Sequence, residues 1–359
     1  MLPSPTRATA GLALLSVLLT AAAPLNPSEM LPGPWSLNKP AQSDLAMGVN
    51  QGCVGCHEDI AAEWQSSLHA QAYTNPEFRR ALHEEPLPFC KGCHAPEADP
   101  NKADNPALQR LGVSCVSCHV VETGILAVPS SRKTASHPVV RQASFATQAA
   151  CGKCHQFAFP GESGSMASSL MQSTINEFRV ISDDSRGCAV CHMPVTEEGH
   201  RSHRFDVSRN APLLRAALRV TARRLGKHRV EMLLSSKAVA HAFPTGDLFR
   251  RLSVQLEALG PEFSQLETHT AYLTREFETT HTLGGVQRRR PVRDTRLPAD
   301  GQPRALVFEW DNDISQCSIR FRVVYQRVQH PGKVGQADAE VAGEVELATG
   351  ELAVEGRGP

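Results

Sequence analysis

The chain has 359 residues, and its 37 basic residues balance its 37 acidic ones. A formal charge of zero argues against a protein that coats nucleic acid, and 41% hydrophobic residues exclude a chain that is disordered by composition. Aromatic residues make up only 5%, so part of the apolar bulk of the core must come from another source. The length allows two or three domains, and 11 cysteines with 15 histidines are the marked excess.

The N-terminus carries an apolar run over residues 10–23, which follows Arg7 and ends in three alanines. This pattern predicts a secretory signal peptide over 1–23, and the Pro- and Ser-rich stretch 24–49 predicts a linker. An uncleaved anchor is the alternative, although the run is shorter than the roughly 20 residues that a spanning helix needs. We therefore expect a periplasmic protein, or one exported to the cell surface, with no transmembrane segment after signal cleavage.

Ten of the cysteines form five C-x-x-C-H motifs, which begin at residues 53, 90, 115, 151 and 188. This is the attachment motif of c-type haem, because its two thiols join one porphyrin and its histidine reaches the iron. Redox-active cysteine pairs and structural zinc sites do not require a histidine after every second cysteine. We predict five c-type haems, held by Cys53, Cys56, Cys90, Cys93, Cys115, Cys118, Cys151, Cys154, Cys188 and Cys191, with the proximal ligands His57, His94, His119, His155 and His192.

Ten histidines lie outside the motifs, and some of them can supply a second axial ligand. An iron with two protein ligands mainly transfers electrons, whereas an open position permits substrate binding. His200 is a reserve for His203, because both follow the fifth motif closely. Four histidines of the C-terminal half are expected not to be ligands (His228, His269, His281 and His330), and Met166 and Met171 are expected to pack against a haem rather than bind it. The predicted distal ligands are His69, His83, His137, His203 and His241.

The motifs are so dense between residues 50 and 206 that little polypeptide is left for an ordinary core. We predict a multihaem cytochrome domain over 50–206 that is rich in short helices and loops, with the porphyrins as its core. Helices are expected near 58–73, 76–84, 104–111, 143–150 and 165–180.

Beyond Arg209, the motifs stop and apolar residues begin to alternate with polar ones. Strands are expected near 218–221, 229–234, 252–257, 305–310 and 318–325. Short strands separated by Gly and Pro turns favour an immunoglobulin-like β-sandwich over 210–359, so the fold class is multidomain α plus β. Cys317 is expected to be packed, and the arginine-rich segment 287–296 to be a solvated loop or a docking patch for an acidic partner.

The segments between the motifs carry further patterns. Trp64 precedes His69 by five positions, and LGVSC (111–115), MQST (171–174), CHMP (191–194) and SHRF (202–205) follow along the chain. Over about 50–206, these segments and the motifs resemble the multihaem cytochrome c family of the cytochrome c-552/4 type. HAFPTG (241–246) is similar to the H-x-x-P-T-G found where such proteins carry a C-terminal β-domain. The resemblance implies periplasmic electron transfer through closely packed haems, and it favours His69 and His203 as distal ligands.

The expected function is electron transfer through five mostly bis-histidine haems, by a carrier rather than an enzyme. We expect redox partner proteins in the cell envelope, such as a quinol dehydrogenase or other cytochromes, and allow for an oligomer. The alternative is an oxidoreductase of the nitrite or hydroxylamine type with one open haem. A structural role, in which the β-domain docks into a larger complex and His241 binds a neighbour's haem, is compatible with electron transfer.

Overall fold

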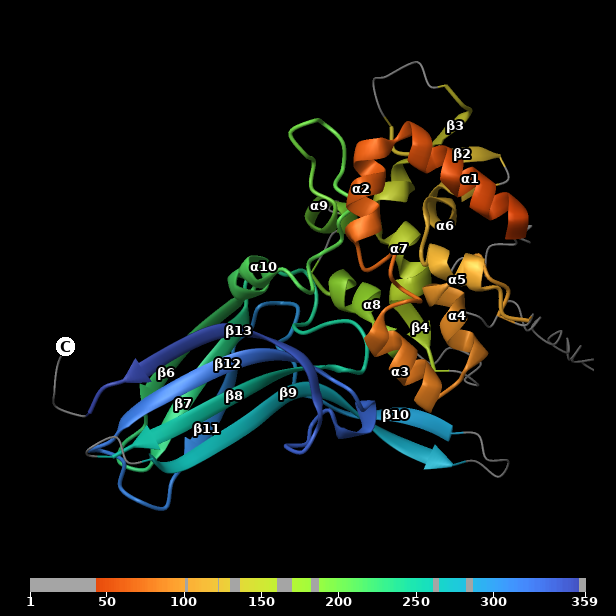
Figure 1. Cartoon of the computed structure of the whole chain (residues 1–359). Helices are drawn as coiled ribbons and strands as arrows, with labels where there is room; N and C mark the ends of the chain where they lie inside the picture. Colours follow the sequence, from red (N-terminus) through yellow and green to blue (C-terminus); the bar gives the residue numbers. More distant parts are fainter. Residues whose placement is uncertain are drawn as a thin grey trace, which may run out of the picture.

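The protein is described here by a computed structural model, which covers residues 43–100, 103–121, 123–129, 136–159, 170–181, 187–260, 265–281 and 287–354. The predicted signal peptide, most of the predicted linker and Met166 lie outside these residues. Figure 1 shows a helix-rich part, formed by the first half of the chain, seated on one end of a strand-rich part formed by the second half.

Short helices dominate the helix-rich part, and the C-x-x-C-H motifs form or end five of them. Asn75 and Asn105 cap two other helices with their side-chain oxygens, and a proline opens each of these helices, where its missing N–H costs nothing. The helices are α1 (Ser43–Cys56), α2 (Glu58–Ser66), α3 (Pro76–Glu84), α4 (Lys91–His94), α5 (Pro106–Leu111), α6 (Cys115–His119), α7 (Gln148–His155), α8 (Thr174–Arg179) and α9 (Cys188–His192).

Small sheets join these helices. β1 (Val120–Val121), β2 (Gly124–Ala127) and β3 (Val139–Arg141) form one sheet, and β4 (Gln156–Ala158) pairs with β5 (Leu170–Ser173) in another. The helix predicted over 165–180 is wrong for residues 170–173, because they pair with β4 directly after the fourth motif. The helix predicted over 58–73 is too long, since α2 ends at Ser66 and the next residue is extended.

Two antiparallel sheets build the strand-rich part. The five-stranded sheet has the order β10 (Gln287–Asp294), β9 (Gln265–His281), β8 (Arg250–Leu259), β12 (Ser318–Val328), β13 (Val341–Leu352). The three-stranded sheet has the order β11 (Arg304–Glu309), β7 (Arg229–Ser236), β6 (Leu218–Arg224), and α10 (Ala211–Ala216) precedes it. All five predicted strands lie in these sheets.

The core of the strand-rich part lies between the two sheets. Met232 and Leu234 of β7 pack in one apolar cluster with Leu252 and Val254 of β8, and all four side chains have no exposed surface. Alternation of buried and half-buried residues along β7 is the pattern of a strand with one face in such a core. Cys317 is packed in this cluster, as predicted, with 3% of its surface exposed. The two parts together give the predicted α plus β architecture, with a sandwich as its second half.

The two parts meet through ion pairs and hydrogen bonds. Arg296 contacts Glu177 of α8 at 2.8 Å, and Arg275 donates to the main-chain oxygen of Leu170 at 2.7 Å. Arg289 contacts Glu85 at 3.0 Å, just beyond α3. Part of the arginine-rich segment is therefore the paired strand β10 rather than a loop, and its arginines help to join the two parts. The domain boundaries at 206 and 210 stay a prediction.

Candidate haem-binding site

The five motifs give five sites, which we number in chain order: first (53–57), second (90–94), third (115–119), fourth (151–155) and fifth (188–192). A helical turn carries each motif, so both thiols and the imidazole come from one short helix segment. None of the ten motif cysteines is buried, whereas Cys317 is. Free cysteines usually rank among the most buried residues, so ten cysteines that are exposed or half-buried fit covalent attachment of a large group.

Four of the motif histidines face a histidine from elsewhere in the chain. The separations of the ring centres are nearly equal, at 6.4 Å in the first site and 6.2 Å in the third, fourth and fifth. The pairs are His57 with His137, His119 with His203, His155 with His69, and His192 with His241.

The spacing of these pairs fits a metal ion held between two imidazoles. Metal–nitrogen bonds of about 2 Å on each side place the ring centres roughly 6 Å apart. Within the described residues, no three His, Cys, Asp or Glu side chains are grouped to hold a metal ion, so the histidines meet as pairs only. Two axial imidazoles and a porphyrin complete the coordination of a haem iron, and the donor set therefore fits haem c.

Burial favours the neutral form of the paired imidazoles in the third, fourth and fifth sites. It lowers the pKa of His69 to about 3, with a further contribution from the nearby His155, and it lowers the pKa of His192 to about 4. Burial also lowers the pKa of His119, His203 and His241, although a main-chain carbonyl opposes the shift in each case. Neutral imidazole is the form that binds a metal, so these side chains are prepared for ligation.

The second site is different. The ring of His94 stacks on Phe78 of α3, with 3.7 Å between the ring centres, and Nδ1 lies 2.7 Å from the main-chain oxygen of Ala72. No histidine side chain within the described part of the chain faces His94 at the spacing of the other four pairs. His83, predicted as a distal ligand, is exposed on α3, and within the described residues its ring does not contact a motif histidine.

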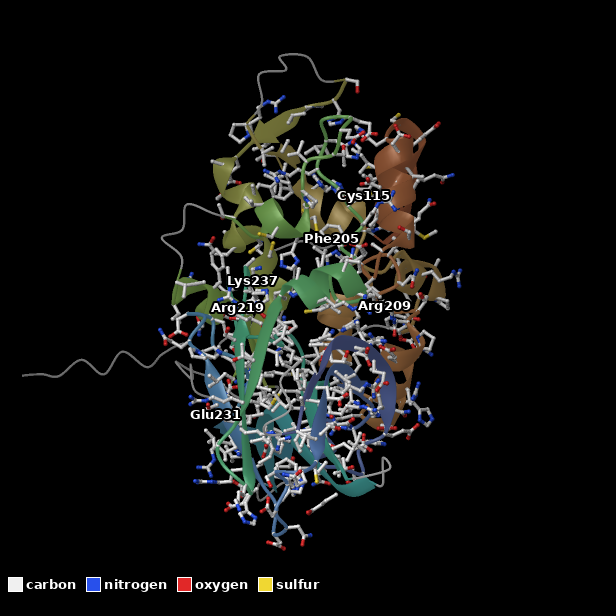
Figure 2. The ribbon with its side chains drawn as sticks, turned by 90° about the vertical axis from the view of Figure 1, so that its left-hand side faces the viewer. Cys115, Phe205, Arg209, Arg219, Glu231 and Lys237 are labelled. Carbon is white, nitrogen blue, oxygen red and sulfur yellow. The ribbon has the colours of Figure 1, made fainter. Side chains whose placement is uncertain are left out.

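Sulfur contacts place the sites next to one another. The side chains of Cys115 and Cys53 interact, which brings the third site beside the first. Cys154 interacts with Cys93, and Cys151 interacts with Cys188, so the fourth site adjoins both the second and the fifth. The third and fourth sites are also neighbours, because His203 of the third pair and His69 of the fourth both contact the ring of Phe205. The ring centres are 5.9 Å apart for His203 and 4.3 Å apart for His69. Figure 2 shows Phe205 and Cys115 within the helix-rich part, beyond the strands that carry Arg219 and Glu231.

Some contacts around the sites were not predicted from the sequence, although Gln172 and Phe205 lie in the MQST and SHRF segments. Gln172 reaches Nδ1 of His155 at 3.1 Å, and Glu63 accepts a hydrogen bond from the main-chain N–H of His203 at 2.7 Å. The ring of Phe205 contacts both His69 and His203, which lie far apart in the chain. Each contact depends on the folding of distant segments, so spacing alone does not reveal it. Within the described ranges, no helix combines the length and apolar composition needed to cross a bilayer.

Comparisons with known proteins support a multihaem c-type cytochrome. Residues 38–204 match the family described as outer membrane cytochrome MtrC/MtrF-like, domains II/IV. The fold is similar to that of a penta-heme cytochrome c552 from Thermochromatium tepidum, with a TM-score of 0.64 and 21% sequence identity. That similarity covers 84% of this chain and 97% of the other. No curated protein sequence matches the chain.

Proposed function

We propose that this multihaem c-type cytochrome relays single electrons through five haems, four of which are held between paired histidines. The observation that carries the proposal is the set of four ring pairs, each of which joins one motif histidine to a histidine outside the motifs at 6.2–6.4 Å. Haem bound in this way gains and loses one electron at its iron without exchanging ligands. The similarity to a penta-heme cytochrome supports the number five.

The chain's own residues prepare the sites for this role. The paired imidazoles would hold the haem irons, and main-chain carbonyl groups hold some of these rings in one orientation, as in the contacts of Nδ1 of His119 with Leu126 (2.9 Å) and of Nδ1 of His203 with Arg201 (2.7 Å). Close packing of the motifs through their sulfur atoms would bring neighbouring haems together. We propose the order first, third, fourth, with the second and fifth sites both adjoining the fourth.

The first site is the proposed point of contact with a redox partner. His57 and His137 are both exposed, and so is Cys56, whereas in each of the other three pairs at least one histidine is half-buried. An electron must enter or leave where a partner protein can approach, and the exposed pair satisfies this condition. We propose partner proteins in the cell envelope, and a location in the periplasm or at the cell surface, which the similarity to outer membrane cytochromes supports.

Coulometric titration of the purified protein tests the relay. We expect five one-electron equivalents for each chain, together with five haems by pyridine haemochrome. Fewer than four equivalents would overturn the proposal. A variant with alanine in place of both Cys188 and Cys191 should lose one haem and one electron equivalent, since it removes both anchors of the fifth site.

The second site favours a second candidate function. His94 has a ring of Phe78 beside it instead of a facing imidazole, and so we propose that its haem can bind an external ligand, as in an oxidoreductase of the nitrite or hydroxylamine type. Carbon monoxide added to the reduced protein should then bind at one haem for each chain.

The variant His83→Ala provides the control for this test. Should His83 be the sixth ligand of the second site, the natural protein would bind no carbon monoxide and the variant would bind one molecule. Equal binding by both proteins, at one molecule for each chain, supports the open site. Absence of binding in both contradicts it.

A further inference from the structure

The distal histidine of the fourth site is held differently from those of the other three pairs. Nδ1 lies near a main-chain oxygen in His137 (3.4 Å), His203 (2.7 Å) and His241 (2.9 Å), and such a contact fixes how the ring is turned. Within the described residues, neither ring nitrogen of His69 makes a hydrogen bond. The orientation of the His69 ring therefore depends on what packs against it.

The ring of Phe205 packs against His69. The ring centres are 4.3 Å apart and the planes make an angle of 61°, which is an edge-to-face contact. The same ring meets His203 of the third site edge-on, at 5.9 Å and 87°. In the part of the chain that the structure describes, no ring contact joins Phe205 to His155 or His119. Phe205 therefore touches the distal histidines of two sites and neither of their motif histidines.

The backbone of Phe205 is strained. Its φ is +47°, in the left-handed region that favours glycine and in which a bulky side chain is rarely found. Such a conformation persists only where the surroundings hold it. The main-chain N–H of His203 donates to Glu63 at 2.7 Å, and Glu63 lies in α2, shortly before His69. This hydrogen bond keeps the chain around Phe205 beside the distal histidine of the fourth site.

We propose that Phe205 is the positioning residue of the fourth site, and that its ring sets the orientation of the His69 imidazole. His203 touches the same ring, but its Nδ1 contact with Arg201 already fixes it, so the third site depends less on Phe205. The proposal rests on the histidine pairs of the relay proposed above. A ligand ring that cannot turn keeps its geometry as the iron gains and loses an electron, and two neighbouring sites would share this one aromatic support.

EPR of the oxidised, haem-loaded full chain reports the orientation of the rings. In a low-spin haem with two imidazoles, the angle between the ring planes affects the anisotropy of the signal, because each ring interacts with the iron d orbitals in one direction. The planes make an angle of 58° in the fourth pair and 29° in the third. The low-spin signal that His69→Ala removes should therefore be more anisotropic than the signal that His203→Ala removes.

Phe205→Leu removes the flat ring and keeps an apolar side chain. We expect five haems and an unchanged number of low-spin signals, but the fourth-site signal should shift and broaden, because the His69 ring then takes several orientations. The third-site signal should change less. Phe205→Tyr keeps the ring and should restore the natural signal. If Phe205→Leu loses a haem, Phe205→Met takes its place, since a flexible apolar chain fills the same space.

Phe145→Leu is the matched control. Phe145 meets His119 of the third site edge-on, with 4.9 Å between the ring centres, and among the described residues its ring contacts neither histidine of the fourth pair. The fourth-site signal should stay unchanged in this variant. The proposal is overturned if Phe205→Leu or Phe205→Met keeps the natural fourth-site signal, or if Phe145→Leu shifts that signal as much. Failure of the relay itself would show in the natural protein, as fewer than four low-spin haems.

Discussion

Replacement of His203 by alanine should open one axial position at the third site and leave the other sites unchanged. The ring of His203 lies 6.2 Å from that of His119, and its Nδ1 is 2.7 Å from the main-chain oxygen of Arg201. Without this imidazole, the iron keeps His119 alone and becomes high-spin. Because one haem in five is affected, about one fifth of the total haem should change from low-spin to high-spin, as measured by EPR of the oxidised protein.

His200 offers a control in the same loop, since the sequence leaves it as a reserve for His203. Its Nδ1 contacts Thr196 and its Nε2 lies 3.5 Å from Glu63, and neither nitrogen faces a motif histidine. Every haem that is low-spin in the natural protein should therefore stay low-spin in His200→Ala. The reasoning is refuted if His200→Ala produces the high-spin signal, or if His203→Ala does not. The variant His203→Met keeps a soft ligand and should restore a low-spin haem at a higher potential.

Two further predictions concern stability, measured by urea titration of the haem-loaded protein. Gly112 has φ of +58°, and a Cβ there would lie 2.4 Å from a main-chain oxygen. Gly112→Ala should therefore lower the free energy of unfolding by about 1–3 kcal/mol. Gly55→Ala is the control and should not lower it, because a Cβ at Gly55 would have nothing within 4 Å. Glu177→Ala should cost about 3 kcal/mol at neutral pH, the lower end for a broken buried pair because Asp294 still contacts Arg296. The low pKa of Glu177 in the folded state means that its contribution is present above the unfolded pKa and lost as pH falls through the folded pKa, so natural protein and variant should converge in acid.

The sequence predicted much of the architecture because the motifs and strands are local patterns. α3 begins and ends where its proline and spacing indicated, and the alternation along β7 was visible in the chain. Residues 170–173 are predicted as a helix from local preference but form strand β5. Their pairing with β4 is a contact between separate segments, and it outweighs that preference.

The histidine pairs were only partly predictable, because one member of each pair belongs to a local motif and the other comes from a distant segment. The motif histidines are identified by their spacing, but the partner of each one depends on how distant segments fold. His69 follows the first motif closely, yet its ring faces His155 of the fourth. His241 faces His192 of the same chain. In the alternative with a structural role, His241 would instead bind the haem of a neighbouring chain. Counting histidines gave candidates, and only their positions in space give pairs.

Spin quantitation by EPR on the oxidised, haem-loaded protein tests the central claim most directly. The claim is that four motif histidines have a facing imidazole, at ring separations of 6.2–6.4 Å. The account predicts at least four low-spin haems with two imidazole ligands for each chain. Two or more high-spin haems for each chain would contradict it.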